Sequence, residues 1–152
     1  MADRILLAGG AVVDGTGAPP RRADVLLEDG RIAAVGAAIP GAEARRIDCA
    51  GLTVCPGFID AHSHSDLQAL EDRREKIRQG VTTEIVGNCG FSAFPCGQDR
   101  AALHEFANGI FRGGSDWGWR GAREYHEAAA RGPGHVTAFS LVGHGTLRIS
   151  QV

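Results

Sequence analysis

Hydrophobic residues in the first third of the chain occur in short runs separated by glycine- and proline-containing turns. Two pairs of runs flank Gly9-Gly10 and Asp29-Gly30, dipeptides that tolerate the positive φ of a tight turn, so each pair predicts a hairpin. The runs are residues 5–7 and 11–13 around the first turn, and 25–27 and 32–35 around the second. Another strand is predicted at 52–54, before Pro56. Residues 1–56 are therefore predicted to form part of a small β-sandwich.

After Pro56 the pattern changes to longer segments in which strands and helices alternate. Strands are predicted within the apolar run 58–62 and at 81–86 and 136–142. Helices are predicted at 67–78, 99–106 and 122–131, with a glycine- and tryptophan-rich loop at 113–121. Gly80 suits the position just past a helix end. Alternation of this kind is typical of a parallel α/β sheet, which we predict for residues 57–152.

Composition limits the classes of partner. The net charge is −2 and no run of basic residues occurs, so we expect neither nucleic acid nor a membrane as a partner. The apolar runs are far shorter than the roughly 20 residues of a membrane span, and the first ten residues lack a secretory signal, so a cytoplasmic location is expected. In that setting the four cysteines are expected to be free, buried or metal-bound thiols rather than disulfides.

Each of the three predicted strands of the second segment is followed by a histidine or a cysteine. His62 and His64 follow the first, Cys89 follows the second, and His144 follows the third. Loops at the C-terminal ends of parallel strands line one common mouth, where chemistry is usually found in such folds. These four residues are therefore the candidate functional residues.

The spacing of His62 and His64 fits a metal site. On an extended segment residues i and i+2 face the same side, about 6.6 Å apart at about 3.3 Å per residue, so both rings can approach one ion. Asp60 and Asp66 flank the pair and are candidate acceptors for the free ring N–H groups. The alternative is that two histidines occur together by chance in a surface loop. The preceding apolar strand and Pro56-Gly57 favour the metal site.

Cys89 lies in the turn Gly87-Asn88-Cys89-Gly90. One interpretation is a small buried thiol between turn residues, which describes most cysteines. The other is a thiolate ligand to the same metal, with the glycines allowing close approach of the backbone. Imidazole and thiolate ligands together favour zinc over magnesium or calcium. The spacing alone does not decide between the two.

The run from Gly51 to His64, GLTVCPGFIDAHSH, resembles the first barrel strand of the amidohydrolase superfamily. Residues 79–92 and 141–148 resemble the second and third strand segments of the D-aminoacylase (N-acyl-D-amino-acid deacylase) family. The resemblance implies a zinc-dependent hydrolase built on a (β/α)8 barrel, with residues 1–56 as the N-terminal part of a β-sandwich domain and 57–152 as the first three strand–helix units. The implied substrate is a small N-acylated D-amino acid, hydrolysed to a carboxylate and a D-amino acid.

The resemblance also assigns roles to the candidate residues. His62 and His64 correspond to the weaker metal position and Cys89 to the tight or bridging one. Related enzymes bridge two metals with a carboxylated lysine. Lys76 is the only lysine here, and it lies in a predicted helix rather than at a strand end. His144 is a candidate substrate-binding residue, with a turn-capping histidine as an equal alternative.

The family takes two further zinc histidines and the catalytic aspartate from later strands, so the general base is expected beyond Val152. We therefore expect this chain to be a fragment or a partial record, inactive alone as a deacylase, and to self-associate through its open sheet edge. Two alternatives stay open. One is another amidohydrolase, similar to dihydroorotase, hydantoinase or isoaspartyl dipeptidase, and the other is a metal-binding fragment without catalysis.

Overall fold

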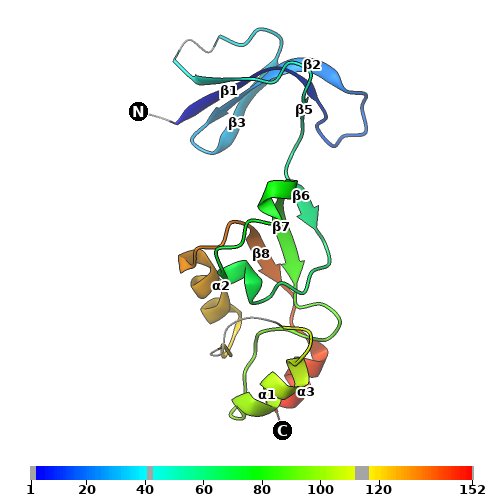
Figure 1. Cartoon of the computed structure of the whole chain (residues 1–152), viewed down its shortest axis with the longest axis vertical. Coiled ribbons are helices and arrows are strands. Elements are labelled where there is room, and N and C mark those ends of the chain that lie inside the picture. Colours follow the sequence, from blue (N-terminus) through cyan, green and yellow to red (C-terminus); the bar gives the residue numbers. More distant parts are fainter. Residues whose placement is uncertain (1–2, 41–42, 112–116, 152) are drawn as a thin grey trace. The chain divides into compact units, whose positions relative to one another are not determined.

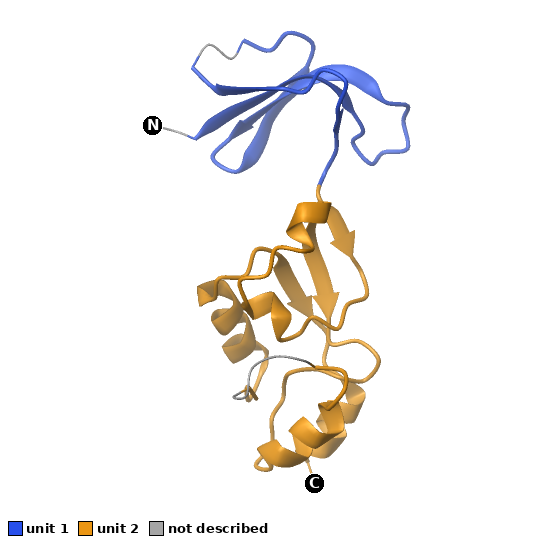
Figure 2. Ribbon diagram, in the orientation of Figure 1, with its two compact units in different colours: residues 1–56 blue, residues 57–152 orange. Residues whose placement is uncertain are grey.

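The computed structural model describes residues 3–40, 43–111 and 117–151, and the chain divides into two compact units, Met1–Pro56 and Gly57–Val152 (Figure 2). The beginning of the predicted loop at 113–121 lies outside the described residues. In the part of the chain that is described, no helix is long and apolar enough to cross a membrane. All four cysteines are free thiols in the structure.

The first unit is a five-stranded sheet. Its strands are β1 (Arg4–Val12), β2 (Arg21–Glu28), β3 (Arg31–Gly36), β4 (Arg45–Asp48) and β5 (Thr53–Val54). The order is β3-β2-β1-β4, with β5 also paired to β1. The β1–β2 and β2–β3 pairs are antiparallel, whereas β4 and β5 run parallel to β1. The packing of this sheet into a sandwich stays a prediction.

Of the two predicted hairpin turns, only the second forms. Asp29 and Gly30 have φ of 47° and 74° and join β2 to β3 as a two-residue turn. The prediction of a turn at Gly9-Gly10 is wrong, because β1 runs through both glycines with a register shift against β2. A Cβ on Gly10 would lie 2.7 Å from Val54 Cγ2, so the glycine is needed for close packing against β5.

The second unit contains the parallel sheet β6-β7-β8, formed by β6 (Phe58–Asp60), β7 (Val81–Val86) and β8 (Thr137–Ser140) (Figure 1). The helices α1 (Arg100–Ala107) and α2 (Ala122–Arg131) confirm the sequence prediction, and Asp99 caps α1 by accepting from Ala102 N at 3.0 Å. A further helix, α3 (His144–Ser150), directly follows β8 and was not predicted.

The helix predicted over residues 67–78 is wrong. This segment contains only two short 3₁₀ turns, η1 (Gln68–Leu70) and η2 (Ile77–Gln79), with Gly80 in the left-handed conformation after η2. Between the turns, Arg73 pairs with Glu71 and Arg74 with Asp72. The two partners of each pair are two residues apart in sequence, and this spacing does not bring side chains together on an α-helix.

The core of the second unit combines residues from β7, α1, α2 and the segments between them. Its fully buried members include Val86 on β7, Leu103 on α1, Tyr125 on α2, and Phe94. Because β6, β7 and β8 are parallel, their C-terminal ends meet at one edge of the sheet. The segments that follow the three strands therefore lie close together, and the candidate residues are on these segments.

Candidate metal centre

His62 and His64 follow β6 on a short segment without regular secondary structure. The His62 backbone N–H donates to Asp60 Oδ1 at 3.2 Å, and the Ser63 N–H donates to Ile85 O at 2.9 Å, which keeps the segment beside β7. The two imidazole centroids are 5.5 Å apart with the ring planes at 72°. The rings therefore share one side of the segment, as the spacing predicted.

Cys89 occupies the turn after β7 with a backbone φ of 55°, an uncommon conformation for a residue with a side chain. Gly87 and Gly90 also have positive φ, at 78° and 86°. The turn brings Cys89 Sγ to 3.3 Å from His62 Nε2, with the thiol exposed. Backbone strain of this kind is often found where a side chain must point in a functional direction.

Together, His62, His64 and Cys89 each offer one ligand atom, and these atoms lie within 4.8 Å of one another. Ligands bonded to one tetrahedral zinc at about 2.0–2.3 Å are about 3.3–3.8 Å apart, so small side-chain movements would bring all three onto one ion. Among the described residues His64 Nδ1 is buried with no hydrogen-bond partner, a costly arrangement for a ring nitrogen. The donor set and this orphaned nitrogen fit zinc.

Contrary to the expectation from the sequence, Asp60 and Asp66 do not accept hydrogen bonds from the ring N–H groups of the two histidines. Asp60 accepts from the backbone of His62 and from Lys76 Nζ, and the bond from Lys76 lowers the pKa of Asp60. Asp66 is fully buried, and no described side chain donates to its carboxylate. Burial raises the pKa of Asp66 to about 7, although the backbone N–H groups of Gly87 and Ala93 partly oppose this rise.

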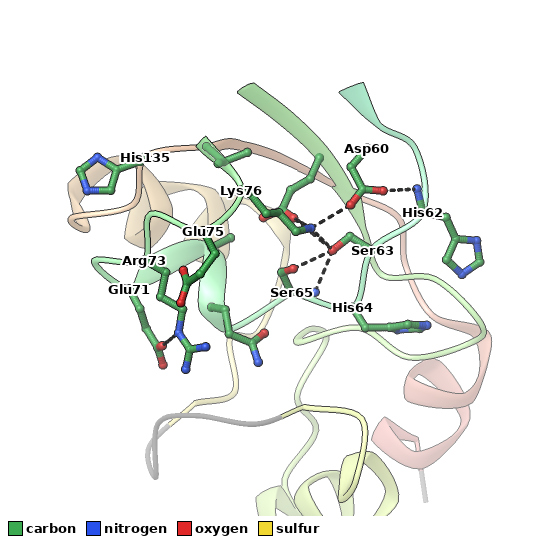
Figure 3. Close-up of a pocket in the computed structure, with 14 residues that line it drawn as sticks. Asp60, His62, Ser63, His64, Ser65, Glu71, Arg73, Glu75, Lys76 and His135 are labelled. Carbon is green, nitrogen blue, oxygen red and sulfur yellow. Dashed lines mark hydrogen bonds and ion pairs between the residues drawn. The ribbon is translucent and has the colours of Figure 1, made fainter. Parts of the chain in front are cut away.

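A charged network that sequence reasoning missed lies behind the histidines (Figure 3). Lys76 Nζ is 2.9 Å from Asp60 Oδ2, 2.7 Å from Ser63 Oγ and in direct contact with Glu84 Oε2. Burial of Lys76 lowers its pKa, but the bonds to Glu84 and Asp60 outweigh that effect and the pKa is raised. Lys76 is thus an ammonium held by two carboxylates. The one available signal was Glu84 itself, a charged residue inside a β-branched strand.

The network and the histidines line one cavity of about 530 Å³. Figure 3 shows His62 and His64 on one side of Ser63 and Lys76 on the other. Farther from the histidines the wall is polar, with the Arg73–Glu71 pair and His135, which contacts Asp72 at 2.7 Å. The cavity is open, and most of the residues that line it are polar or charged.

His144 is not a member of the His62–His64–Cys89 cluster. It is the exposed first residue of α3, and the backbone of its neighbours Gly143 and Gly145 packs against Gly90. His144 therefore lies next to the cysteine turn. Its proposed contact with substrate stays a prediction.

Gly87 is expected to be essential for this turn. A Cβ at Gly87 would lie 2.2 Å from Leu141 O, at a φ of 78°. We expect Gly87→Ala to lower the free energy of unfolding by more than the roughly 1–2 kcal/mol of left-handed strain alone. Gly90→Ala is the matched control, because its φ is 86° but its Cβ would lie 3.6 Å from the nearest described atom, Gly145 N. Equal losses in urea unfolding would contradict the expected clash.

The fold and the site together define an α/β chain with a mixed imidazole and thiolate cluster at the ends of parallel strands. The amidohydrolase family model matches residues 45–151. This match covers more than half of the chain, so the chain belongs to the amidohydrolase family. The family recognised in the sequence and the predicted α/β fold are both confirmed.

Within that family the chain is similar to D-aminoacylases. The D-aminoacylase of Alcaligenes xylosoxydans xylosoxydans is 40% identical over 146 residues, which are 95% of this chain and 30% of that protein. A crystal structure of D-aminoacylase matches with a TM-score of 0.80 and 44% identity, covering 99% of this chain and 31% of the other. The N-acyl-D-glutamate deacylase of Bordetella bronchiseptica, solved with zinc and a phosphonate inhibitor, matches with a TM-score of 0.80 and 39% identity, over 97% and 31%. The chain thus spans about 30% of the length of these relatives.

Proposed function

We propose that His62, His64 and Cys89 bind zinc and that the chain forms the metal-binding N-terminal part of an N-acyl-D-amino-acid deacylase. The observation that carries the metal site is the convergence of the three ligand atoms within 4.8 Å, from two separate strand ends. His64 Nδ1, which is buried and has no partner in the described part of the chain, supports it. A packed structural thiol would not need a strained backbone that points an exposed sulfur at an imidazole.

The proposed reaction is hydrolysis of the amide bond of a small N-acylated D-amino acid. Zinc, when bound, supplies a Lewis acid that polarises the amide carbonyl and lowers the pKa of a bound water towards ~7. The role of His62, His64 and Cys89 in that reaction is to hold the metal, and none of them is proposed as the general base. The similarity to deacylases of D-aminoacyl substrates over at least 95% of this chain supports the substrate class.

Assay of the complete gene product that contains this chain tests the proposal. With zinc bound, we expect hydrolysis of N-acetyl-D-amino acids, much slower hydrolysis of the L-enantiomers, and none of cyclic amides such as dihydroorotate. Enantiomer pairs are matched controls because they differ only in handedness. Preference for cyclic amides would assign the chain to another branch of the amidohydrolases. Zinc binding without turnover of any of these substrates would support the proposed metal site and contradict the proposed reaction.

A further inference from the structure

Ser63, the residue between the two candidate histidine ligands, is tied to the segment that carries Cys89. It is 6% exposed. Its backbone N–H donates to Ile85 O at 2.9 Å, and its carbonyl accepts from Asn88 Nδ2 at 3.1 Å. Ile85 is on β7, and Asn88 directly precedes Cys89. One residue therefore connects the two segments whose side chains converge in the cluster.

The hydroxyl of Ser63 is also fixed in direction. Its Oγ lies 3.0 Å from Glu84 Oε2 and 2.7 Å from Lys76 Nζ. An ammonium only donates and an ionised carboxylate only accepts, so the hydroxyl accepts from Lys76 and donates to Glu84. Its one proton is then used, and Ser65 Oγ, 2.7 Å away, is the donor in the bond between the two serine hydroxyls. Ser65 adds its backbone N–H, which donates to Ser63 Oγ at 3.1 Å. Charge-assisted bonds of this kind are stronger than neutral ones.

Glu84 and Lys76 make this arrangement costly to change. Glu84 is 2% exposed, and a buried carboxylate needs a cation or hydrogen bonds to remain ionised. Asp60 and Glu84 are register partners on β6 and β7, so both side chains reach the same ammonium. Buried ion pairs add little net stability compared with apolar packing. The Glu84–Lys76 pair is therefore better explained by its bonds to the Ser63 hydroxyl, which it holds in one orientation.

We propose that Ser63 is a positioning residue for the metal centre. Held by Asn88, Glu84 and Lys76, it fixes His62 and His64 relative to Cys89. The inference rests on the proposed metal function, and it assigns to the Glu84–Lys76 pair the task of locking the Ser63 hydroxyl. Groups that orient metal ligands typically change metal affinity by about 10- to 100-fold when removed.

Cobalt(II) titration of the purified chain tests the proposal, because a bound thiolate gives a charge-transfer band that reports the cysteine–metal geometry. Ser63→Ala is expected to weaken cobalt binding about tenfold or more and to shift that band. Ser150→Ala is the matched control. It also removes a hydroxyl of the second unit, one that contacts Pro95 O and Thr146 O, neither within two residues of a candidate ligand. Equal affinities and spectra for the two variants would overturn the proposal.

A second pair of variants tests the role of the charges. Lys76→Met is expected to weaken cobalt binding, because it leaves Glu84 buried without its cation. Adding Glu84→Gln should restore most of the affinity, since a glutamine oxygen still accepts from the Ser63 hydroxyl while the unpaired charge is gone. A general loss of packing would not be rescued by a second substitution. If the double variant binds cobalt as weakly as Lys76→Met does, the Glu84–Lys76 pair does not lock the Ser63 hydroxyl.

A measurement without metal separates this inference from the proposed function. In the metal-free chain, nuclear Overhauser contacts between the His62 ring protons and the Cys89 β protons are expected, because Nε2 and Sγ are 3.3 Å apart. They should be lost in Ser63→Ala and kept in Ser150→Ala. A wild-type chain that shows these contacts but binds no cobalt would contradict the metal function only. Contacts that persist in Ser63→Ala would contradict the positioning role only.

Discussion

Replacing Cys89 by serine is expected to abolish tight zinc binding by the chain. The thiolate is the only anionic ligand of the proposed set, and it bonds zinc at about 2.3 Å, whereas the imidazoles contribute no charge. A serine hydroxyl keeps its proton at neutral pH and is a poor replacement. We expect the loss of affinity to exceed the about 10- to 100-fold that is typical of residues that only orient a ligand.

The measurement is zinc content after equilibrium dialysis against a competing chelator. His62→Ala and His64→Ala, made separately, should lose less affinity than Cys89→Ser, because each retains the thiolate and one imidazole. Cys55→Ser is the matched control, since Cys55 is also an exposed free thiol but lies in the first unit, outside the cluster. Unchanged zinc affinity in Cys89→Ser would make Cys89 only a turn residue and remove the main physical support for the proposed metal site.

The second large effect concerns stability. Lys76→Met removes the cation beside Glu84, which is 2% exposed. Removing one partner of a buried ion pair typically costs 3–5 kcal/mol, because the remaining charge is left without compensation. Lys76 itself is about one-third exposed, so water screens part of this loss. We expect the free energy of unfolding to fall by about 3 kcal/mol.

Urea unfolding of the chain measures this effect, and Arg74→Met supplies the control. Arg74 pairs with Asp72 at 3.2 Å, but both side chains are more than half exposed, so this pair should contribute less than about 1 kcal/mol. The double variant Lys76→Met with Glu84→Gln should recover most of the stability, since no charge remains buried alone. Equal losses in Lys76→Met and Arg74→Met would show that Glu84 does not depend on Lys76.

Local sequence patterns predicted the elements that depend on local chemistry. The Asp29-Gly30 turn formed because both positions accept positive φ, and Asp99 capped α1 as its side chain allows. The strand at 81–86 was evident from its β-branched residues. Parallel strands place their C-terminal ends together, so the meeting of His62, His64 and Cys89 could also be expected from sequence. What these residues bind remains a prediction.

Tertiary structure decided the conformation of segments that contact residues distant in the chain. Gly9-Gly10 reads locally as a turn, but pairing with β2 and close packing against Val54 keep β1 extended through it. The charged segment at 67–78 has helical composition, yet its short-range ion pairs and the reach of Lys76 to Asp60 and Glu84 replace the helix. Hydrophobic periodicity reports which side of an element is buried. It does not report which buried charges are close in space, so the network around Ser63 became evident only from the fold.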